Sequence, residues 1–396
     1  MGFELAPEHE DFRTVVRDFA EREVAPFIAD WDQRHHFPVH LVQRMGELGL
    51  FGLVVPERFG GAGGDFTSFC VAVEELGRVD QSVGITLSAG VGLGINPILT
   101  FGTDEQRERW LPDLVAGRAI AAFGLTEPDG GSDAADTRTR ARLEGVAGTA
   151  EWVIDGAKAF ITNSGTSVTS AVTVTACTGQ RPDGRPEIST IIVPAGTDGF
   201  LVEPAYRKLG WHASDTHGLT FDGCRVPAGN LLGERGRGFH QFLAILDDGR
   251  ISISALALGL ARACLEACQQ YACTRLAFGR AIGANQGIAF QVADLAVAVE
   301  SARLLTYRAA WLKDEHTAGR RSLAEVKQAA AIAKLATSTT AVDATRVAIQ
   351  VFGGNGFMEE YPLARYYRDA KVLEIGEGTS EVQRLVIARG LGLPVG

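Results

Sequence analysis

Cysteine is scarce in this 396-residue chain, and the six cysteines form neither a CxxC pair nor a cluster with histidine. The one adjacent histidine pair, His35 and His36, has no matching ligand cluster near it in the sequence, so we expect no metal site. Scattered single cysteines are typical of proteins in a reducing compartment, and we therefore expect a cytoplasmic protein.

Long apolar runs, targeting signals and basic clusters are also missing. No uninterrupted apolar run approaches the length of a membrane span. The N-terminal stretch MGFELAPEHEDFRTVV has no basic segment followed by an apolar one, so no secretory signal is visible. Acidic and basic residues are interspersed, with a net charge of −10, whereas a nucleic-acid-binding protein needs a clustered basic face. We expect neither a membrane nor a nucleic acid as partner.

The common nucleotide and hydrolase motifs are absent. No GxGxxG follows a predicted strand, because the glycine runs GAGGDF, GVGLG and GGNGF each fail the spacing. The sequence has no GxxxxGK, HExxH or GxSxG either. These absences argue against a doubly wound nicotinamide dehydrogenase, a nucleotide kinase, a zinc hydrolase and an α/β-hydrolase.

Two helical segments flank a segment of different composition. Residues 1–122 carry apolar side chains at helical spacing, such as Val16 and Phe19, and residues 231–396 contain long alanine- and leucine-rich runs typical of a four-helix bundle. Residues 123–230 are richer in threonine, valine and isoleucine, with short alternating runs separated by Asp-Gly turns. We predict an α+β protein with an N-terminal helical domain, a middle antiparallel β-barrel or sandwich, and a C-terminal bundle with those bounds.

A short stretch near the C-terminus, LEIGEGTSEVQRL (373–385), places Glu377 between two glycines. Gly376 and Gly378 permit backbone conformations closed to other residues and close approach to a ligand. Ser380 and Gln383 have the spacing of a capping box, which predicts a helix directly after the acid. The alternative without function is a solvated turn whose carboxylate complements the helix dipole.

Four further loops are rich in glycine and hydroxyl groups: GLTEPDGGSD (124–133), FITNS (160–164), RLAFGRAIGANQ (275–286) and QVFGGNGF (350–357). The first is a candidate anion or cofactor cradle, because Thr126, Ser132 and several backbone N–H groups lie near its glycines. Each loop taken alone is more often a structural turn than a ligand site.

In their order and spacing, these four loops and the Glu377 stretch resemble the acyl-CoA dehydrogenase family, from about residue 5 to the C-terminus. The segments DDGRISISALALGLAR and ESARLLTYRAAWLKD are most similar to the short-chain and bacterial branch. The resemblance implies FAD bound between the β domain and the C-terminal helices without a Rossmann fingerprint. It also implies electron-transfer flavoprotein as electron acceptor, and a homotetramer in which subunits share FAD.

The resemblance assigns roles to individual residues. Phe160 and Thr162 match the aromatic and the threonine that flank the flavin ring, and Arg275, Phe278 and Gln286 match residues that hold the FAD of a neighbouring subunit. The full set that resembles the family's FAD contacts is Phe123, Leu125, Thr126, Ser132, Phe160, Thr162, Arg275, Phe278, Gln286, Gln350, Gly353, Gly354, Thr379 and Glu381.

Glu377 matches the family's catalytic base, which removes the pro-R α proton of an acyl-CoA thioester while a β hydride passes to the flavin, giving a trans-2-enoyl-CoA. The base's backbone N–H would help to bind the thioester oxygen. We expect desolvation to raise the pKa of Glu377 by more than the helix N-terminus lowers it. The residues that resemble substrate contacts are Ser88, Ser132, Asp247, Arg250 and Gly378, of which Asp247 would contact the pantetheine arm and Arg250 would face the base.

Two departures from the family pattern bear on the substrate. Gly376 stands where relatives often have tyrosine, which predicts tolerance of branched, bulky or polar-ended acyl groups. Ser88 lies where the family ends its acyl pocket, and a small residue there allows a medium chain, or a carboxyl-ended chain if the hydroxyl donates a hydrogen bond. Asp129 adds a charge near the substrate mouth.

Three alternatives stay open on this scaffold. The same base and flavin would serve a 2-enoyl-CoA reductase, because the electron acceptor decides the direction. A flavin monooxygenase or oxidase generally lacks a matching base, so Glu377 argues against it. A non-catalytic binding protein is the third alternative, and a colourless purified protein would favour it.

Overall fold

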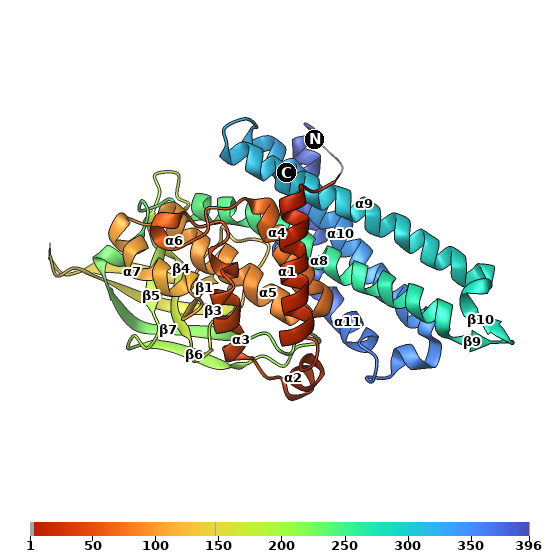
Figure 1. Ribbon diagram of the computed structural model, residues 1–396. Helices are drawn as coiled ribbons and strands as arrows, with labels where there is room; N and C mark the ends of the chain where they lie inside the picture. The colour runs from red at the N-terminus through yellow and green to blue at the C-terminus, as the bar shows by residue number, and fades with distance from the viewer. Residues whose placement is uncertain (1–3, 147, 396) are drawn as a thin grey trace.

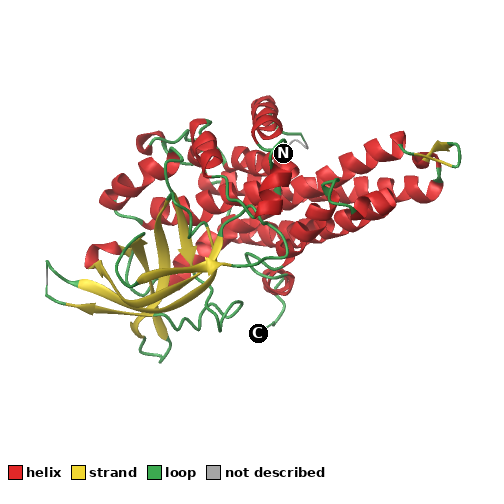
Figure 2. Cartoon of the chain, turned by 90° about the horizontal axis from the view of Figure 1, so that it is seen from below, coloured by secondary structure: helices red, strands yellow, loops and turns green. Residues whose placement is uncertain are grey.

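An eight-stranded sheet lies at one end of the molecule and a long helical bundle extends toward the other, with the N-terminal helices packed beside both (Figures 1 and 2). This computed structural model describes residues 4–146 and 148–395. The element order is α, then β, then α, which is the order that the sequence predicts.

The N-terminal segment consists of short helices with well-defined starts. Asp65 caps α4, Asp80 caps α5, and Thr103 with Gln106 forms a capping box at α7. The elements are α1 Pro7–Glu23, α2 Ile28–Arg34, α3 Val39–Glu47, η1 Leu50–Gly52, η2 Glu57–Phe59, α4 Phe66–Val79, α5 Gln81–Ala89, the π-helical turn η3 Gly90–Ile95, α6 Asn96–Phe101 and α7 Asp104–Val115.

The middle segment is a mixed sheet with the strand order β6-β7-β3-β2-β4-β5-β8. Most pairs are antiparallel, as expected, but β4 pairs in parallel with both β1 and β2. The strands are β1 Ile120–Gly124, β2 Arg140–Glu144, β3 Glu151–Thr162, β4 Thr169–Gln180, β5 Pro186–Pro194, β6 Phe200–Ala205, β7 Thr216–Pro227 and, after η4 Ala228–Asn230, β8 Leu231–Leu232. The sheet thus begins before residue 123 and ends after residue 230.

Within the described residues, three long helices and two short ones form the C-terminal segment. They are α8 Gly238–Thr274, α9 Gln286–Thr317, α10 Leu323–Phe352, α11 Leu363–Ala370 and α12 Ser380–Gly390, with η5 Ile282–Ala284, η6 Gly353–Phe357 and η7 Lys371–Glu374 between them. The small strands β9 Leu276–Ala277 and β10 Arg280–Ala281 form a hairpin at the far tip of the bundle, where α8 turns into α9 (Figures 1 and 2).

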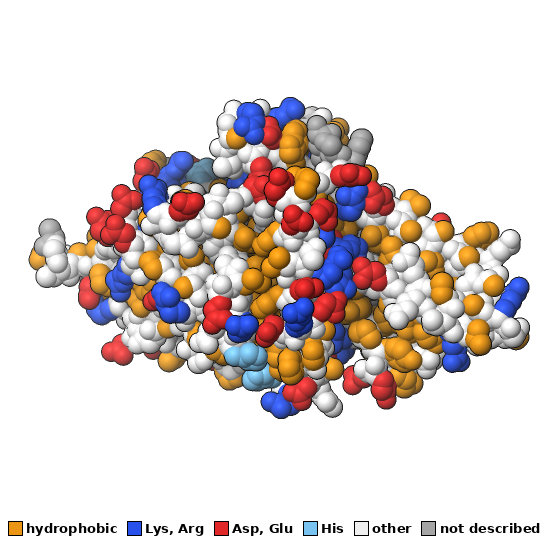
Figure 3. Space-filling model, in the orientation of Figure 1, with side chains coloured by type: hydrophobic (Ala, Val, Ile, Leu, Met, Phe, Trp, Pro, Cys, Tyr) orange, Lys and Arg blue, Asp and Glu red, His pale blue; other side chains and the backbone are white. Residues whose placement is uncertain are grey.

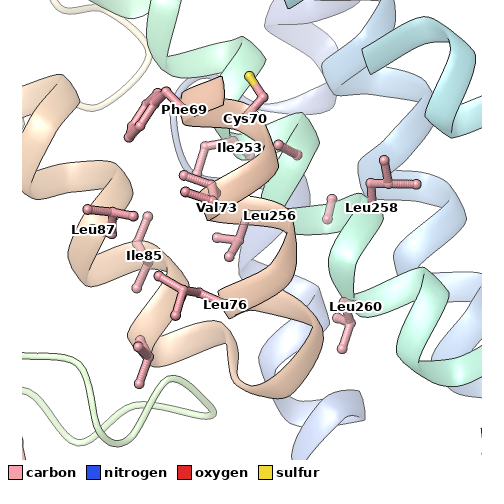
Figure 4. Close-up of a cluster of buried hydrophobic side chains, with 14 of the residues drawn as sticks. Phe69, Cys70, Val73, Leu76, Ile85, Leu87, Ile253, Leu256, Leu258 and Leu260 are labelled. Carbon is pink, nitrogen blue, oxygen red and sulfur yellow. The ribbon is translucent and has the colours of Figure 1, made fainter. Parts of the chain in front are cut away.

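The N-terminal helices and the bundle share one hydrophobic core. Figure 4 shows side chains of α4 and α5, such as Leu76 and Ile85, against Leu256 of α8. Gly259 lets the helices approach closely, since a Cβ there would lie 2.3 Å from the carbonyl oxygen of Glu74. The sheet has a separate core that includes Trp152 and Ile154.

Two helical stretches have the length and mean composition of a membrane span, although polar residues interrupt the apolar run in both. Gln81–Phe101 and Gly238–Thr274 are long and apolar enough by length and composition. Their most apolar parts are 72 % and 78 % buried inside the protein. Burial on nearly all sides accounts for this composition, because a helix inside a core has few solvent-facing positions.

Charges are interspersed on the face of the molecule seen in Figure 3, but a group of them is buried. The carboxylate of Glu75 on α4 accepts hydrogen bonds from Arg13 (2.7 Å), Arg17 (3.0 Å) and Arg262 (2.8 Å). Burial alone would raise the pKa of Glu75, but the hydrogen bonds and charges of these arginines lower it to about 2. This ion network links α1, α4 and α8.

We predict that Glu75→Gln lowers the free energy of unfolding by about 3 kcal/mol, because it leaves four arginines, Arg78 included, around a neutral group. Because the pKa of Glu75 is depressed, its stabilisation is present above pH 4.5 and is lost as the pH falls toward 2. The deficit of the variant should therefore shrink over that window in denaturant titrations. Glu266→Gln is the control, because Glu266 is an exposed partner of Arg78 and Arg262 and should change stability by less than about 1 kcal/mol. Equal effects of both variants would contradict the prediction.

Candidate active site

Glu377 lies in a tight turn between η7 and α12. Its φ is 55° and that of Gly378 is 90°, so two successive residues occupy the left-handed region. This conformation suits glycine but is strained for glutamate, and strain of this kind is concentrated at functional sites. Gly376, the glycine before the acid, does not adopt a positive φ.

The helix after this turn begins at Ser380, but the predicted capping box is wrong by one residue. Thr379 is the N-cap, and its hydroxyl accepts a hydrogen bond from Val382 N at 3.3 Å. Ser380 lies inside the helix with a buried hydroxyl, and the Gln383 amide turns back to the carbonyl oxygens of Glu377 (3.3 Å) and Gly378 (2.9 Å). The glutamine therefore stabilises the turn rather than capping the helix.

The carboxylate of Glu377 lies against the backbone of α8. A Cβ added at Gly249 would lie 1.9 Å from Glu377 Oε2, so the missing side chain of Gly249 leaves the space that the carboxylate fills. Oε2 is buried and has no hydrogen-bond partner among the described residues, although Glu377 as a whole is only partly buried. Burial raises the pKa of Glu377 to about 7, opposed by the positive charges of Arg250 and Lys334.

Arg250 and Asp247 form a buried ion pair one helical turn apart on α8. Arg250 Nη1 donates to Asp247 Oδ1 at 2.7 Å, and Lys327 Nζ lies 3.5 Å from Asp247 Oδ2. The structure thus places Arg250 near Glu377, as the resemblance implies. Asp247 contacts Arg250. Burial raises the pKa of Asp247 against the influence of Arg250.

A short chain of hydroxyl groups connects α5 to the same part of α8. Ser88 donates to Ser252 Oγ at 2.9 Å, and Ser252 donates to the carbonyl oxygen of Gly249 at 3.0 Å. Both serines are almost completely buried. The hydroxyl of Ser88 is therefore hydrogen-bonded inside the protein. Through Ser252 it is connected to Gly249, the residue that the carboxylate of Glu377 contacts.

Unpartnered buried polar atoms gather around Glu377. Besides Glu377 Oε2, they include Arg250 Nε, Ser380 Oγ and Gln383 Oε1, for which the described residues offer no hydrogen-bond partner. Folded proteins leave few buried polar atoms unpaired without a reason, and a ligand site is one such reason. Together with the strained turn and the raised pKa of Glu377, these atoms mark the turn and the adjoining part of α8 as the candidate active site.

A buried lysine on β3 holds the loop after β1 through hydrogen bonds. Lys158 on β3 donates to the carbonyl oxygen of Leu125 (3.1 Å), to Glu127 Oε1 (2.7 Å) and to Thr175 Oγ1 (3.2 Å). Burial lowers the pKa of Lys158 to about 8, against the effect of Glu127. The loop thus lies along β3, where Ala159 N donates to the carbonyl oxygen of Thr126 at 2.8 Å.

β3 presents an exposed aromatic ring beside this loop. The register of β3 shifts between Lys158 and Ile161, and within that bulge Phe160 has a φ of 62° and is 65 % exposed. Thr162 follows at the strand end, and Asn163 Nδ2 donates to the carbonyl oxygen of Thr86 on α5 at 3.3 Å. The strand end that carries Phe160 and Thr162 is therefore attached to the helix that carries Ser88.

These groups fit the flavin that the resemblance implies. Phe160 offers a flat apolar face, and Thr162 and Thr126 offer hydroxyls. The N–H and hydroxyl of Thr126 have no hydrogen-bond partner within residues 4–146 and 148–395. Phe123 differs, because its ring is buried against Phe242 with 6.2 Å between ring centroids.

The remaining predicted cofactor residues lie elsewhere. Ser132 is exposed on the loop after β1, and Thr379 and Glu381 are at the start of α12. A second set is exposed near the far end of the bundle: Arg275, Phe278, Gln286, Gln350, Gly353 and Gly354. At about 1.5 Å per residue, Gln350 is about 24 Å along α10 from Lys334, which contacts the Glu377 turn. Within one chain the two sets are not brought together.

Sequence reasoning missed Gly249, Gln383, Lys158 and Lys334 as residues of the site. Gly249 and Gln383 lie in segments that the sequence singles out because of other residues, and neither carries a separate signal of a role in the site. The two lysines did carry a signal, because each interrupts an apolar run, Lys158 in a strand and Lys334 in AAAIAKLA. A lysine at a buried position needs a partner, and such partners are often functional.

We predict that Glu377→Gln stabilises the protein at pH 8 but not at pH 4. The pKa of Glu377 is raised from 4.5 to about 7 on folding, so its favourable contribution is present below pH 4.5 and is lost as the pH rises through 7. Glutamine resembles the neutral carboxyl and avoids that loss, which amounts to about 3 kcal/mol at most. The measurement is the difference in melting temperature between variant and wild type across this pH range, and a difference that does not change with pH would contradict the prediction.

Comparison with known proteins agrees with this arrangement. Family models described as the N-terminal, middle and C-terminal domains of acyl-CoA dehydrogenase match residues 6–118, 122–224 and 236–392. A probable acyl-CoA dehydrogenase of Bacillus subtilis (strain 168) is 46% identical over 391 residues, which are 99% of this chain and 100% of the relative.

Two solved structures are also similar. Butyryl-CoA dehydrogenase from Megasphaera elsdenii superimposes with a TM-score of 0.92 at 40% identity, covering 99% of this chain and 100% of the other. A glutaryl-coenzyme A dehydrogenase in complex with glutaryl-CoA gives a TM-score of 0.92 at 34% identity, covering 99% and 97%. The chain therefore belongs to the acyl-CoA dehydrogenase family, whose members are flavin-dependent oxidoreductases that act on CH–CH bonds.

Proposed function

We propose that this enzyme is an FAD-dependent acyl-CoA dehydrogenase that oxidises a short- or medium-chain acyl-CoA to the trans-2-enoyl-CoA and passes the electrons to electron-transfer flavoprotein. The observation that carries the proposal is the Glu377 carboxylate, whose Oε2 is buried without a hydrogen-bond partner among the described residues and whose pKa is raised to about 7. A general base works best when its pKa lies near the working pH.

Glu377 takes the α proton of the thioester on its carboxylate. Arg250 and Lys334 keep the buried group ionisable by opposing the effect of desolvation on its pKa. The strained turn fixes the direction of the side chain and of the backbone N–H, which would donate to the thioester oxygen as negative charge develops there. When bound, FAD supplies the acceptor for the β hydride.

The residues that would hold FAD in one chain are those along β3 and the loop after β1, namely Leu125, Thr126, Phe160 and Thr162, with Thr379 and Glu381 at the start of α12. The second set, at the far end of the bundle, would serve the FAD of a neighbouring subunit in a homotetramer. Phe278 supports this assignment, because its aromatic ring is fully exposed on a hairpin tip and its φ of 53° is strained for a residue with a side chain.

A short apolar acyl chain is the substrate favoured by the hydrogen bonds of Ser88. Its hydroxyl donates to Ser252, so binding an ω-carboxylate would require that bond to be exchanged. Gly376 leaves space beside the turn and favours tolerance of α- or β-branched chains. Butyryl-CoA and its branched analogues are therefore the first substrates to test, with glutaryl-CoA as the carboxyl-ended comparison.

The reverse reaction, reduction of a 2-enoyl-CoA, is the second candidate function. A group with a pKa of about 7 is close to half protonated at neutral pH, so Glu377 is suited to donating the α proton as well as to removing it. The electron donor or acceptor would then decide the direction.

We predict that anaerobic addition of butyryl-CoA bleaches the flavin of the wild-type enzyme, and that Glu377→Gln slows this bleaching by at least about 10²-fold because the general base is lost. Chain-length dependence is read from hexanoyl- and octanoyl-CoA, and branching from isobutyryl- and isovaleryl-CoA. A flavin that is bleached at the same rate in wild type and Glu377→Gln would overturn the role of Glu377. A flavin that no thioester bleaches would favour an oxidase or monooxygenase.

A separate prediction concerns the cofactor set at the hairpin tip. Arg275→Ala should lower the amount of FAD that co-purifies, because a cation that would neutralise the pyrophosphate is removed. Arg280→Ala is the matched control, since its guanidinium donates within the loop to Asn285 Oδ1 at 2.6 Å. The measurement is the ratio of flavin to protein absorbance after gel filtration, and equal ratios for both variants would contradict the assignment.

A further inference from the structure

Lys334 is a fully buried lysine in the middle of α10, on a helix face that it shares with small side chains such as Ala330, Thr337 and Ala341. Its ammonium donates to the carbonyl oxygen of Gly378 at 2.8 Å, and this is its only hydrogen bond to the residues in 4–146 and 148–395. Burying an ammonium with so few partners is unfavourable, and burial lowers the pKa of Lys334 to about 8. A methionine or leucine would fill the same space without that cost, so the charge calls for an explanation.

The carbonyl of Gly378 belongs to the turn that carries Glu377. It accepts a second hydrogen bond from Gln383 Nε2 at 2.9 Å, so α10 and α12 hold the same oxygen from two sides. Glu377 and Gly378 both have backbone conformations in the left-handed region. A strained backbone of this kind persists only where the surrounding contacts hold it in place.

We propose, on the basis of the proposed function, that Lys334 is a positioning residue for the dehydrogenation: its ammonium holds the strained Glu377–Gly378 turn and supplies the buried positive charge that keeps the Glu377 carboxylate available as a base. Lys334 does not contact the reacting atoms in this role. It acts through the turn and through the charge that it places close to the carboxylate.

The charge of Lys334 can be distinguished from the other charges near the turn. Positive and negative groups face Lys334 and Glu377 from each neighbouring element: Asp247 and Arg250 on α8, Lys327 on α10, Glu374 in η7 and Glu381 on α12. Arg250 is partly neutralised by its ion pair with Asp247, whereas the ammonium of Lys334 donates to a neutral carbonyl. Lys334 therefore contributes a buried charge without a carboxylate in direct contact.

The test compares Lys334→Gln, which keeps an amide donor but removes the charge, with Lys334→Met, which removes both. We expect the acidic limb of the pH profile for flavin reduction to move upward by about one pH unit in both variants. At pH 7 the rate falls about fivefold, because the ionised fraction of a base whose pKa rises from about 7 to about 8 drops from about a half to about a tenth. KM for the thioester should stay unchanged, and only Lys334→Met should also loosen the turn.

Lys371→Gln is the matched control. It removes an equal charge from the segment just before the turn, but Lys371 is 57% exposed and paired with Glu374, so solvent screens its effect on Glu377. We expect its pH profile to follow that of the wild type.

A second readout needs neither substrate nor flavin reduction. The melting-temperature difference between forms with Glu377 and with Glu377→Gln reports the ionisation of Glu377, and its pH midpoint should also rise by about one unit in the Lys334→Gln background. Loss of activity in Glu377→Gln with no shift of either midpoint in Lys334→Gln would overturn the inference on Lys334 alone. Full activity of Glu377→Gln would overturn the proposed base and the role of Lys334 with it.

Discussion

The close approach of α8 to the Glu377 turn is the contact on which the candidate site depends. Only a residue without a side chain at position 249 leaves room for the carboxylate, and only burial there brings its pKa to about 7. The turn must then be strained to direct the side chain at the helix, and the strain requires Lys334 and Gln383 to hold the Gly378 carbonyl. The ionisation of Glu377, the backbone conformation of its turn and the packing of the turn on α8 thus depend on one another.

Rigidity at this contact comes from the packing of three segments that are distant in the sequence. α5 supplies Ser88, which reaches the Gly249 carbonyl through Ser252, and it also accepts the hydrogen bond from Asn163 at the end of β3. The strand end that carries Phe160 and Thr162 is therefore connected to the base through a buried helix rather than through a flexible loop. Groups placed on such elements hold their geometry better than groups on mobile loops.

Much of this architecture could be predicted from the sequence, because helical periodicity, Asp-Gly turns and the change in composition are local signals. The parallel pairing of β4 with β1 and β2 could not, since it depends on contacts between residues far apart in the chain. In the site, Glu377 and its two glycines stand out in the sequence. The sequence predicts Ser380 as the N-cap, whereas the structure has Thr379, because either hydroxyl is a suitable N-cap by residue type. The side-chain amide of Gln383 donates to the turn, and this contact between residues is what the sequence does not show. Gly249 and Lys334 are meaningful only once α8 and α10 are placed beside the turn.

The division of the hydrophobic interior into two cores has a consequence for biosynthesis. The face of α4 is buried mainly against α8, and α5 also packs against α8, whose first residue, Gly238, is translated long after theirs. The β domain, which has its own core, is complete before that point. During translation the sheet can therefore fold as a unit, while the N-terminal helices keep apolar surface exposed until the C-terminal helices emerge. A chain that stops before α8 would carry a finished sheet and an uncovered helical face, which makes such truncated products targets for chaperones and for aggregation.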